Sequence, residues 1–452
     1  MADTIAAIAT PPATGAIGII RLSGPDAIRV ADQVFLPYGP ARLSEAAPRC
    51  AHFGRINDRD GSLLDQALAL VFPAPHSYTG ENCVELQCHG GLRLLDRILR
   101  LCFDAGARQA ERGEFTKRAF LNGKMDLTEA EAVADLIHAE TLDGVRNAAG
   151  QLTGSLGREL DGIYQSLLDL NAHLTAYIDY TDEGVEPPDL TDAESTCRTA
   201  ATRLRKLADT FSEGRLFTEG VRCAIVGRPN VGKSSLLNCL CGFDRSIVTD
   251  IAGTTRDTIE ETVQVGPILL RLIDTAGLRA EGADAVEQLG IDRTRTALRG
   301  AGLVLAVYDG STPLTDADRE VQALLGTCEA PVITIINKSD LPPAMDVPAD
   351  AICISAATGS NVDALRERIL SLCEADELHP DGGMITNRRQ AESLYRAAES
   401  AENAANALAA GFTPDVAWVD AEASMTSIGE VTGKTVSAEI LSRVFERFCV
   451  GK

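Results

Sequence analysis

The spacing of apolar residues predicts a mixture of strands and helices in residues 1–118 of this 452-residue chain. Asp65–Phe72 is typical of a largely buried strand, whereas Cys83–His89 alternates apolar and polar positions as a half-buried strand does. A helix is indicated by apolar residues three and four apart, namely Leu95, Ile98 and Cys102. We therefore predict an N-terminal α+β domain.

Helical patterns lie on both sides of a segment of α/β character. In residues 218–374, β-branched runs typical of buried parallel strands alternate with helical stripes. The runs are Cys223–Val226, Leu303–Val307 and Val332–Ile336. Because domain termini often lie close together, we predict an all-α domain made of residues 119–217 and 375–452, with the α/β domain inserted into it.

Two helix starts are predicted from capping-box spacing in the first helical segment. In such a box the side chain of a Ser or Thr accepts a hydrogen bond from the backbone N–H three residues later. The acid at that later position accepts from the backbone N–H of the Ser or Thr. The candidate pairs are Thr128 with Glu131 and Thr191 with Glu194.

Composition narrows the class of protein. The net charge of −23 disfavours a broad surface for nucleic acid, whose binding depends on phosphate contacts, so an RNA substrate would need a local basic patch or a basic partner. The apolar tract Ile5–Ile20 is broken by proline and glycine, which excludes a membrane span. With no signal peptide and 12 scattered cysteines without a CxxC pair, we expect a cytoplasmic protein with reduced thiols.

Gly227–Ser234 reads GRPNVGKS and directly follows a predicted strand. It fits the phosphate loop G-x-x-x-x-G-K-[ST], in which backbone N–H groups wrap the phosphates, Lys233 reaches the β- and γ-phosphates, and Ser234 binds magnesium. The predicted contacts from this loop are Asn230, Val231, Gly232, Lys233, Ser234 and Ser235.

Three further elements follow in the order expected for a GTP-binding domain. Asp274–Gly277 (DTAG) would place Asp274 near the magnesium and the Gly277 amide near the γ-phosphate. Asn337–Asp340 (NKSD) would use Asp340 to accept two N–H bonds from guanine, which adenine does not offer. Asn337 would fix this loop against the phosphate loop. The third element, Ser355-Ala356, ends another predicted strand and would present a backbone N–H to the guanine oxygen. Lys338 is a further predicted contact.

The segment Thr249–Asp257 offers hydroxyls and backbone carbonyls to the same site. Thr255 is the candidate for closing over the magnesium. With Asn230, neutral oxygens here would suit potassium, which would neutralise developing charge as an arginine finger does. The alternative is that Asn230 only shapes its turn.

The residue after Gly277 is Leu278, where many GTPases carry the glutamine that orients water. Acids follow at Glu281, Asp284, Glu287 and Asp292. Glu287 is the candidate for orienting water through a second water. The alternative is an acid on a solvated helix face.

The whole chain resembles the MnmE (TrmE) family of tRNA modification GTPases. The resemblance rests on the phosphate loop, Thr249–Asp257, Asp274–Arg279, and the ending Phe448–Lys452 (FCVGK). It also rests on N-terminal pieces: Thr10–Pro12, Gly18–Arg21, Tyr78–Glu81, His89–Gly91 and Gly113–Phe115 through Lys124.

The resemblance implies GTP hydrolysis driven by potassium-assisted dimerisation of the GTP domains, with Glu287 orienting water. It implies potassium ligands at Asn230, Thr249, Ile251 and Thr254. It also implies a homodimer formed by the N-terminal domains.

The resemblance further implies a folate site and a tRNA reaction. The folate contacts carried over are Arg21, Glu85, Lys124 and Lys452. A 5-formyl- or 5,10-methylene-tetrahydrofolate would supply one carbon to C5 of the wobble uridine, together with an MnmG-type flavoprotein that carries FAD and holds most of the tRNA. Glycine or ammonium would supply the nitrogen. Cys449 is a candidate nucleophile or base, or a helix-packing residue beside Phe448.

One other class of protein explains residues 218–374 equally well. A ribosome-assembly or signalling GTPase would need the same nucleotide site without small-molecule chemistry. It would not account for Arg21, Glu85, Lys124 and the Cys-Val-Gly-Lys ending.

Overall fold

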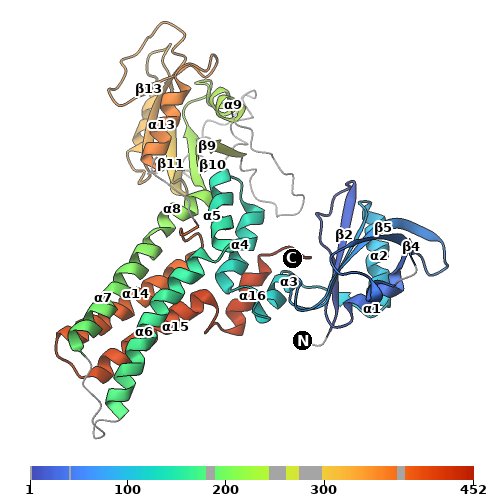
Figure 1. Ribbon diagram of the computed structural model, residues 1–452. Coiled ribbons are helices and arrows are strands. Elements are labelled where there is room, and N and C mark those ends of the chain that lie inside the picture. The colour runs from blue at the N-terminus through green and yellow to red at the C-terminus, as the bar shows by residue number, and fades with distance from the viewer. Residues whose placement is uncertain (1–2, 40–41, 180–188, 244–260, 274–297, 374–381) are drawn as a thin grey trace. The chain divides into compact units, whose positions relative to one another are not determined.

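The computed structural model describes residues 3–39, 42–179, 189–243, 261–273, 298–373 and 382–452. The chain divides into two compact units (Figure 1). Unit 1 comprises residues 1–134, 151–201 and 399–452, and unit 2 comprises residues 135–150 and 202–398.

Unit 1 contains a seven-stranded sheet in the order β3-β4-β5-β6-β2-β1-β7, antiparallel except where β1 pairs with β7. Its strands are β1 (Ile5–Ile8), β2 (Ile17–Ser23), β3 (Phe35–Pro37), β4 (Ala51–Asn57), β5 (Leu63–Phe72), β6 (Cys83–His89) and β7 (Arg108–Gln109). The helical elements beside it are α1 (Ala27–Val34), η1 (Leu43–Glu45), α2 (Leu92–Asp104) and α3 (Glu114–Leu121).

Helices α1 and α2 cover one face of this sheet (Figure 1). The predicted strand Cys83–His89 is confirmed, with Val84, Leu86 and Cys88 buried toward these helices. The prediction that Asp65–Phe72 is largely buried was wrong, because β5 alternates and Leu68 is 37% exposed on the opposite face. Only one face of an antiparallel sheet need be covered.

The remaining helical segments run from residue 127 to 209 and from 388 onward. They are α4 (Leu127–His138), α5 (Leu142–Leu152), α6 (Ser155–Asp179), α7 (Leu190–Asp209), α14 (Arg388–Ala409), α15 (Pro414–Thr432) and α16 (Ala438–Glu446). Within unit 1, α6 packs against α15, and the Trp418 indole donates to the Thr175 hydroxyl. None of the helices in the described residues is long and apolar enough to cross a membrane.

The two predicted capping boxes were displaced by two residues. In α4, Asp126 rather than Thr128 exchanges hydrogen bonds with Glu129 (2.7 and 2.8 Å). In α7, the Asp189 carboxylate accepts from the N–H groups of Thr191 and Asp192. An aspartate upstream of the threonine caps at least as well, so each helix begins earlier than predicted.

Unit 2 contains a six-stranded sheet in the order β13-β12-β11-β8-β10-β9, with β9 antiparallel and the others parallel. Its strands are β8 (Val221–Val226), β9 (Glu261–Val265), β10 (Ile268–Ile273), β11 (Leu303–Asp309), β12 (Val332–Asn337) and β13 (Ile352–Cys353). Its helices include α8 (Phe211–Thr218), α9 (Lys233–Phe243), α12 (Asp316–Leu325) and α13 (Val362–Leu372).

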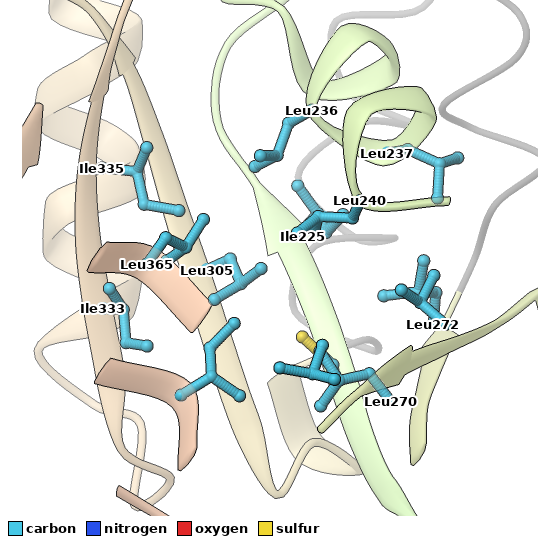
Figure 2. Packing of buried hydrophobic residues seen from close by; sticks show 14 of the residues in the cluster. Ile225, Leu236, Leu237, Leu240, Leu270, Leu272, Leu305, Ile333, Ile335 and Leu365 are labelled. Carbon is cyan, nitrogen blue, oxygen red and sulfur yellow. The ribbon is translucent and has the colours of Figure 1, made fainter. Parts of the chain in front are cut away.

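Helices cover both faces of this sheet, as the predicted parallel strands require. On one face, Leu236, Leu237 and Leu240 of α9 pack with Ile225 of β8 and with Leu270 and Leu272 of β10 (Figure 2). Leu365 of α13 packs near β11 and β12 on the same face (Figure 2). On the other face, α12 packs against a second apolar cluster. Strand β8 lies between β10 and β11, so the chain crosses to opposite sides of it. Open parallel sheets bind ligands at the carboxyl edge of such a switch point.

Candidate nucleotide-binding site and a second polar cluster

The phosphate loop connects the carboxyl end of β8 to the first turn of α9, as the sequence predicts. Lys233 is half-buried, and its ammonium donates to the carbonyls of Gly227 (3.0 Å) and Arg228 (2.8 Å). The lysine side chain therefore folds back over the loop, and the N-terminus of α9 faces the same edge. The N-terminus of a helix favours anions, because the helix dipole places positive charge there.

Two glycines of the loop occupy positions that a side chain would obstruct. Gly232 has φ +97°, and a Cβ there would collide with the side-chain amide of Asn337. Gly227 has φ +155°, and a Cβ would collide with the carbonyl of Val307 in β11. Both close approaches hold the loop tightly against its neighbours.

Asn337, at the end of β12, joins two loops of the site. Its Nδ2 donates to the carbonyl of Val231 (2.8 Å), and its Oδ1 accepts from the N–H of Ala356 (3.0 Å). The predicted contact between this asparagine and the phosphate loop is thus present. Since the side chain is 2% exposed, it links the phosphate loop to the loop after β13 through dry hydrogen bonds.

Asp340 and Ser355, predicted to face guanine, are also brought together. The Ser355 hydroxyl donates to the Asp340 carboxylate (2.6 Å). The serine is fully buried and the aspartate is exposed. This bond fixes the carboxylate at the rim of the site, which leaves its other oxygen available to an N–H donor.

Two ion pairs that the sequence analysis missed brace this site. Lys338 donates to the buried Asp309 carboxylate (2.6 Å) and to the carbonyl of Asn230 (3.0 Å). Arg228 pairs with Asp318 (3.2 Å), which also closes a capping box with Thr315 at the start of α12. The capping-box spacing of Thr315 and Asp318 was the one signal available in the sequence.

Burial and the ion pair with Lys338 both shift the pKa of the Asp309 carboxyl. Burial raises this pKa, but hydrogen bonds from Lys338 and Ser311 outweigh the burial and leave the pKa below its usual value. Asp309 is therefore ionised at neutral pH and holds Lys338 against the phosphate loop.

Asn230 adopts a left-handed backbone conformation (φ +64°) and is exposed. Asparagine tolerates this region better than most residues, so the turn-shaping interpretation of Asn230 has a structural basis. Seven predicted residues of the nucleotide and metal sites, the hydrolytic acid Glu287 among them, lie outside the described residues: Thr249, Ile251, Thr254, Thr255, Asp274, Gly277 and Glu287.

A second cluster in unit 1 gathers predicted residues that are far apart in the sequence. Arg21 and Glu85 lie directly opposite each other on β2 and β6, and the guanidinium donates to the carboxylate through Nε (2.9 Å). The pair lies on the sheet face that α1 and α2 leave open. Tyr78 and Phe115 stack on the same guanidinium, with ring centroids 5.7 and 5.8 Å from its central carbon.

The C-terminal residues reach this cluster. The Gly451 carbonyl accepts from Arg21 (3.4 Å), and the Phe115 N–H donates to the Lys452 carbonyl (3.2 Å). Burial lowers the pKa of Lys452, the charge of Arg21 lowers it further, and the charge of Glu85 opposes both. Lys452 therefore lies within electrostatic reach of the pair.

Two other predicted residues occupy the edges of this cluster. Cys449 is exposed, while its neighbour Phe448 is buried, so the thiol does not pack in the helical core. Lys124 is exposed and donates to the carbonyl of Pro75 (3.2 Å), at the start of the loop that carries Tyr78. The structure thus brings Arg21, Glu85 and Lys452 together and places Lys124 beside the adjoining loop.

A phosphate loop after the switch-point strand of a doubly wound sheet, fastened to an Asn-Lys-x-Asp loop, defines a P-loop nucleotide-binding protein. Comparison with family models matches residues 127–449, more than half of the chain, to the MnmE helical domain, and residues 4–124 to the GTP-binding protein TrmE N-terminus. The chain belongs to the MnmE family.

Individual relatives match this chain along nearly its full length. The chain is 42% identical to the tRNA modification GTPase MnmE of Roseiflexus castenholzii, covering 100% of this chain and 99% of that protein. It is 43% identical to the tRNA modification GTPase MnmE of Akkermansia muciniphila, covering 99% of each. Among solved structures, Era in complex with MgGDPNP and a 16S ribosomal RNA fragment is 27% identical over 40% of this chain and 66% of that chain, with a TM-score of 0.27.

Proposed function

We propose that this protein hydrolyses GTP and couples the hydrolysis to modification of tRNA. Its relatives along the full chain are named tRNA modification GTPases. The observation that carries the proposal is the coexistence of two assembled sites, the braced phosphate loop of unit 2 and the Arg21–Glu85–Lys452 cluster of unit 1. A GTPase that acts only as a binding switch needs the first site and has no use for the second.

The residues of unit 2 suit a guanine nucleotide with magnesium. Lys233, folded over the phosphate loop, would bind the phosphates. Ser234, in the first turn of α9, would bind magnesium. Asp340, held by Ser355, would accept the guanine N–H groups. Thr255 and Asp274 complete the proposed magnesium surroundings. When bound, the magnesium ion withdraws charge from the β- and γ-phosphates.

We assign the orientation of the attacking water to Glu287 and charge neutralisation to potassium held by Asn230, Thr249, Ile251 and Thr254. In Glu287→Ala, GTP affinity should stay near that of the wild type, while the single-turnover hydrolysis rate falls by orders of magnitude. Glu281→Ala, from the same segment, is the matched control and should retain activity. Equal hydrolysis rates in potassium and in sodium would remove the cation from the proposal.

In unit 1 we propose a site for a tetrahydrofolate that carries one carbon. The Arg21–Glu85 pair presents a donor and an acceptor side by side, which suits a pterin carbonyl next to its amino and ring N–H groups. Lys452 and Lys124 add positive charge for carboxylates of the glutamate tail. Cys449, exposed near Lys452, is the candidate reactive thiol.

Equilibrium dialysis of the full chain against 5-formyl-tetrahydrofolate tests this site. We expect Glu85→Ala to weaken binding by at least tenfold, and the exposed control Glu111→Ala to leave it unchanged. Absence of binding to the wild type would favour a GTPase without small-molecule chemistry.

The open face of the unit 1 sheet supports the proposed homodimer. Phe53 and Leu68 are paired neighbours on β4 and β5, exposed by 53% and 37%. Tyr38 packs against Phe53 with tilted rings whose centroids are 5.2 Å apart. Exposed apolar patches on a sheet commonly mark interfaces. Phe53→Glu should convert the dimer to a monomer in analytical ultracentrifugation, while Arg59→Glu, on the turn after β4, should not.

We base the proposed partner, tRNA substrate and product on membership in the MnmE family. A flavoprotein of the MnmG type would carry FAD and hold most of the tRNA, which suits a chain of net charge −23. The expected product is an aminomethyl-type group at C5 of the wobble uridine, in the cytoplasm. Nucleoside analysis of tRNA from cells that lack the chain should show the unmodified uridine, and an unchanged nucleoside profile would contradict the proposal.

A further inference from the structure

Unit 2 contains a cavity at the edge of its sheet opposite the phosphate loop. The cavity measures about 520 Å³ and is lined by the starts of β8 and β11, the end of α8, a residue of β10, and the end of α13. A cavity of this size lies within the range of sites for small ligands.

The cavity carries four arginines, Arg215, Arg222, Arg271 and Arg299, and one acid, Glu219. The whole chain has 65 acidic residues against 42 lysines and arginines, so a chance selection of its charged residues would favour acids here. Guanidinium groups around one space repel each other, and an anion between them relieves this repulsion.

The presence of Arg271 at the cavity is explained by its contacts within the protein. Its Nε donates to the carbonyl of Glu219 (2.6 Å) just beyond the end of α8, and its Nη2 lies 3.4 Å from the carboxylate of Glu140. It therefore caps a helix C-terminus, as cations do. Arg222 lies opposite Arg271 where β8 pairs with β10. Arg222 also has interactions within the protein, so it is not a free guanidinium.

No contact with the described residues explains the presence of Arg215 and Arg299 at the cavity. Both are exposed, and among the described residues neither guanidinium makes a hydrogen bond or an ion pair. Arg215 belongs to α8, and Arg299 precedes the Gly300–Gly302 turn that leads into β11. Two exposed arginines that line one cavity suit phosphate oxygens, which a guanidinium binds through two parallel N–H groups.

We propose that this cavity is a second anion-binding site that takes phosphate groups, separate from the nucleotide site, with Arg215 and Arg299 as its ligands. The phosphates come either from a small phosphorylated molecule or from the backbone of tRNA. The second source rests on the proposed function, whereas the first does not.

The test uses the full chain saturated with GDP and magnesium, so that the phosphate loop is occupied. Calorimetric titration with tripolyphosphate is compared between the wild type and the double variant Arg215→Ala/Arg299→Ala. Arg319→Ala is the matched control, because Arg319 is an exposed arginine of α12 in the same unit, paired only with Asp316 among the described residues. Equal melting temperatures of the variants exclude an effect on folding.

We expect the tripolyphosphate affinity to fall at least tenfold in the double variant and to stay unchanged in the control. A parallel titration with an unmodified tRNA transcript identifies the source. If the backbone is the ligand, tRNA affinity falls as well. The slope of log K against log salt then decreases by about 0.7–0.9 for each phosphate that the variant no longer neutralises.

A weakening confined to tripolyphosphate assigns the site to a small phosphorylated ligand. Unchanged affinity of the double variant for both ligands overturns the proposal. Failure of the proposed tRNA modification would leave the tripolyphosphate result intact, so the two failures are distinguishable.

Discussion

Replacing Asn337 with alanine should weaken the nucleotide site and unit 2 together. The substitution leaves the Val231 carbonyl and the Ala356 N–H without their partner, both within a region where Asn337 is 2% exposed. Each buried group left unpaired costs about 1–3 kcal/mol. The free energy of unfolding of unit 2 should therefore fall by about 2–6 kcal/mol.

The nucleotide affinity should fall as well, because the phosphate loop loses its link to the loop after β13. If one of the two hydrogen bonds is needed to hold the nucleotide-bound arrangement, the affinity for GDP falls by about ten- to a hundredfold, at 1.4 kcal/mol per factor of ten. Fluorescent GDP titration gives the dissociation constant, and urea unfolding gives the stability.

A matched amide substitution controls for this experiment. Gln264→Ala removes one exposed hydrogen bond, from Nε2 to the Gly266 carbonyl, in the same unit, and should change neither quantity measurably. If Asn337→Ala bound GDP within twofold of the wild type and unfolded at the same urea concentration, the proposed role of the asparagine as a link would be wrong.

Three other substitutions test particular contacts. Gly232→Ala should abolish nucleotide binding, because φ is +97° and the new Cβ meets the Asn337 amide; near-normal GDP titration would contradict this. Arg118→Leu should destabilise unit 1 by about 3–5 kcal/mol, because this 2% exposed guanidinium pairs with Glu114 and Glu81, and a melting temperature within a few degrees of the wild type would refute it. Burial raises the pKa of Glu114, yet hydrogen bonds, first from Arg108, leave this pKa below its usual value. A carboxylate with a depressed folded pKa stabilises above its unfolded pKa and loses this contribution as pH falls through the folded value. Thermal unfolding from pH 6 to 3 should therefore be less pH-dependent in Glu114→Gln than in the wild type, and identical profiles would refute this assignment.

The sequence by itself determined the local elements of this protein. The strand Cys83–His89 and the buried parallel strands β8, β11 and β12 follow from periodicity, because the burial of a strand residue depends on the face it occupies. The phosphate loop follows from eight consecutive residues, whose contacts with phosphate are made largely by their own backbone. Resemblance then supplied the family, which the full-length comparisons show.

Only the tertiary structure decided which distant side chains meet. The Arg228–Asp318 and Asp309–Lys338 pairs that brace the nucleotide site join residues 90 and 29 positions apart, and an ion pair across such a separation leaves no periodic trace in a sequence. The same holds for the four arginines that line the cavity at the sheet edge opposite the phosphate loop. The exposed face of β5 depended on where α1 and α2 pack. The same run of apolar residues is compatible with a sheet covered on one face and with a sheet covered on both. The local pattern predicts the elements because the period of apolar residues reflects which face of each helix or strand is buried, whereas the sites require packing between elements that the chain itself does not place side by side.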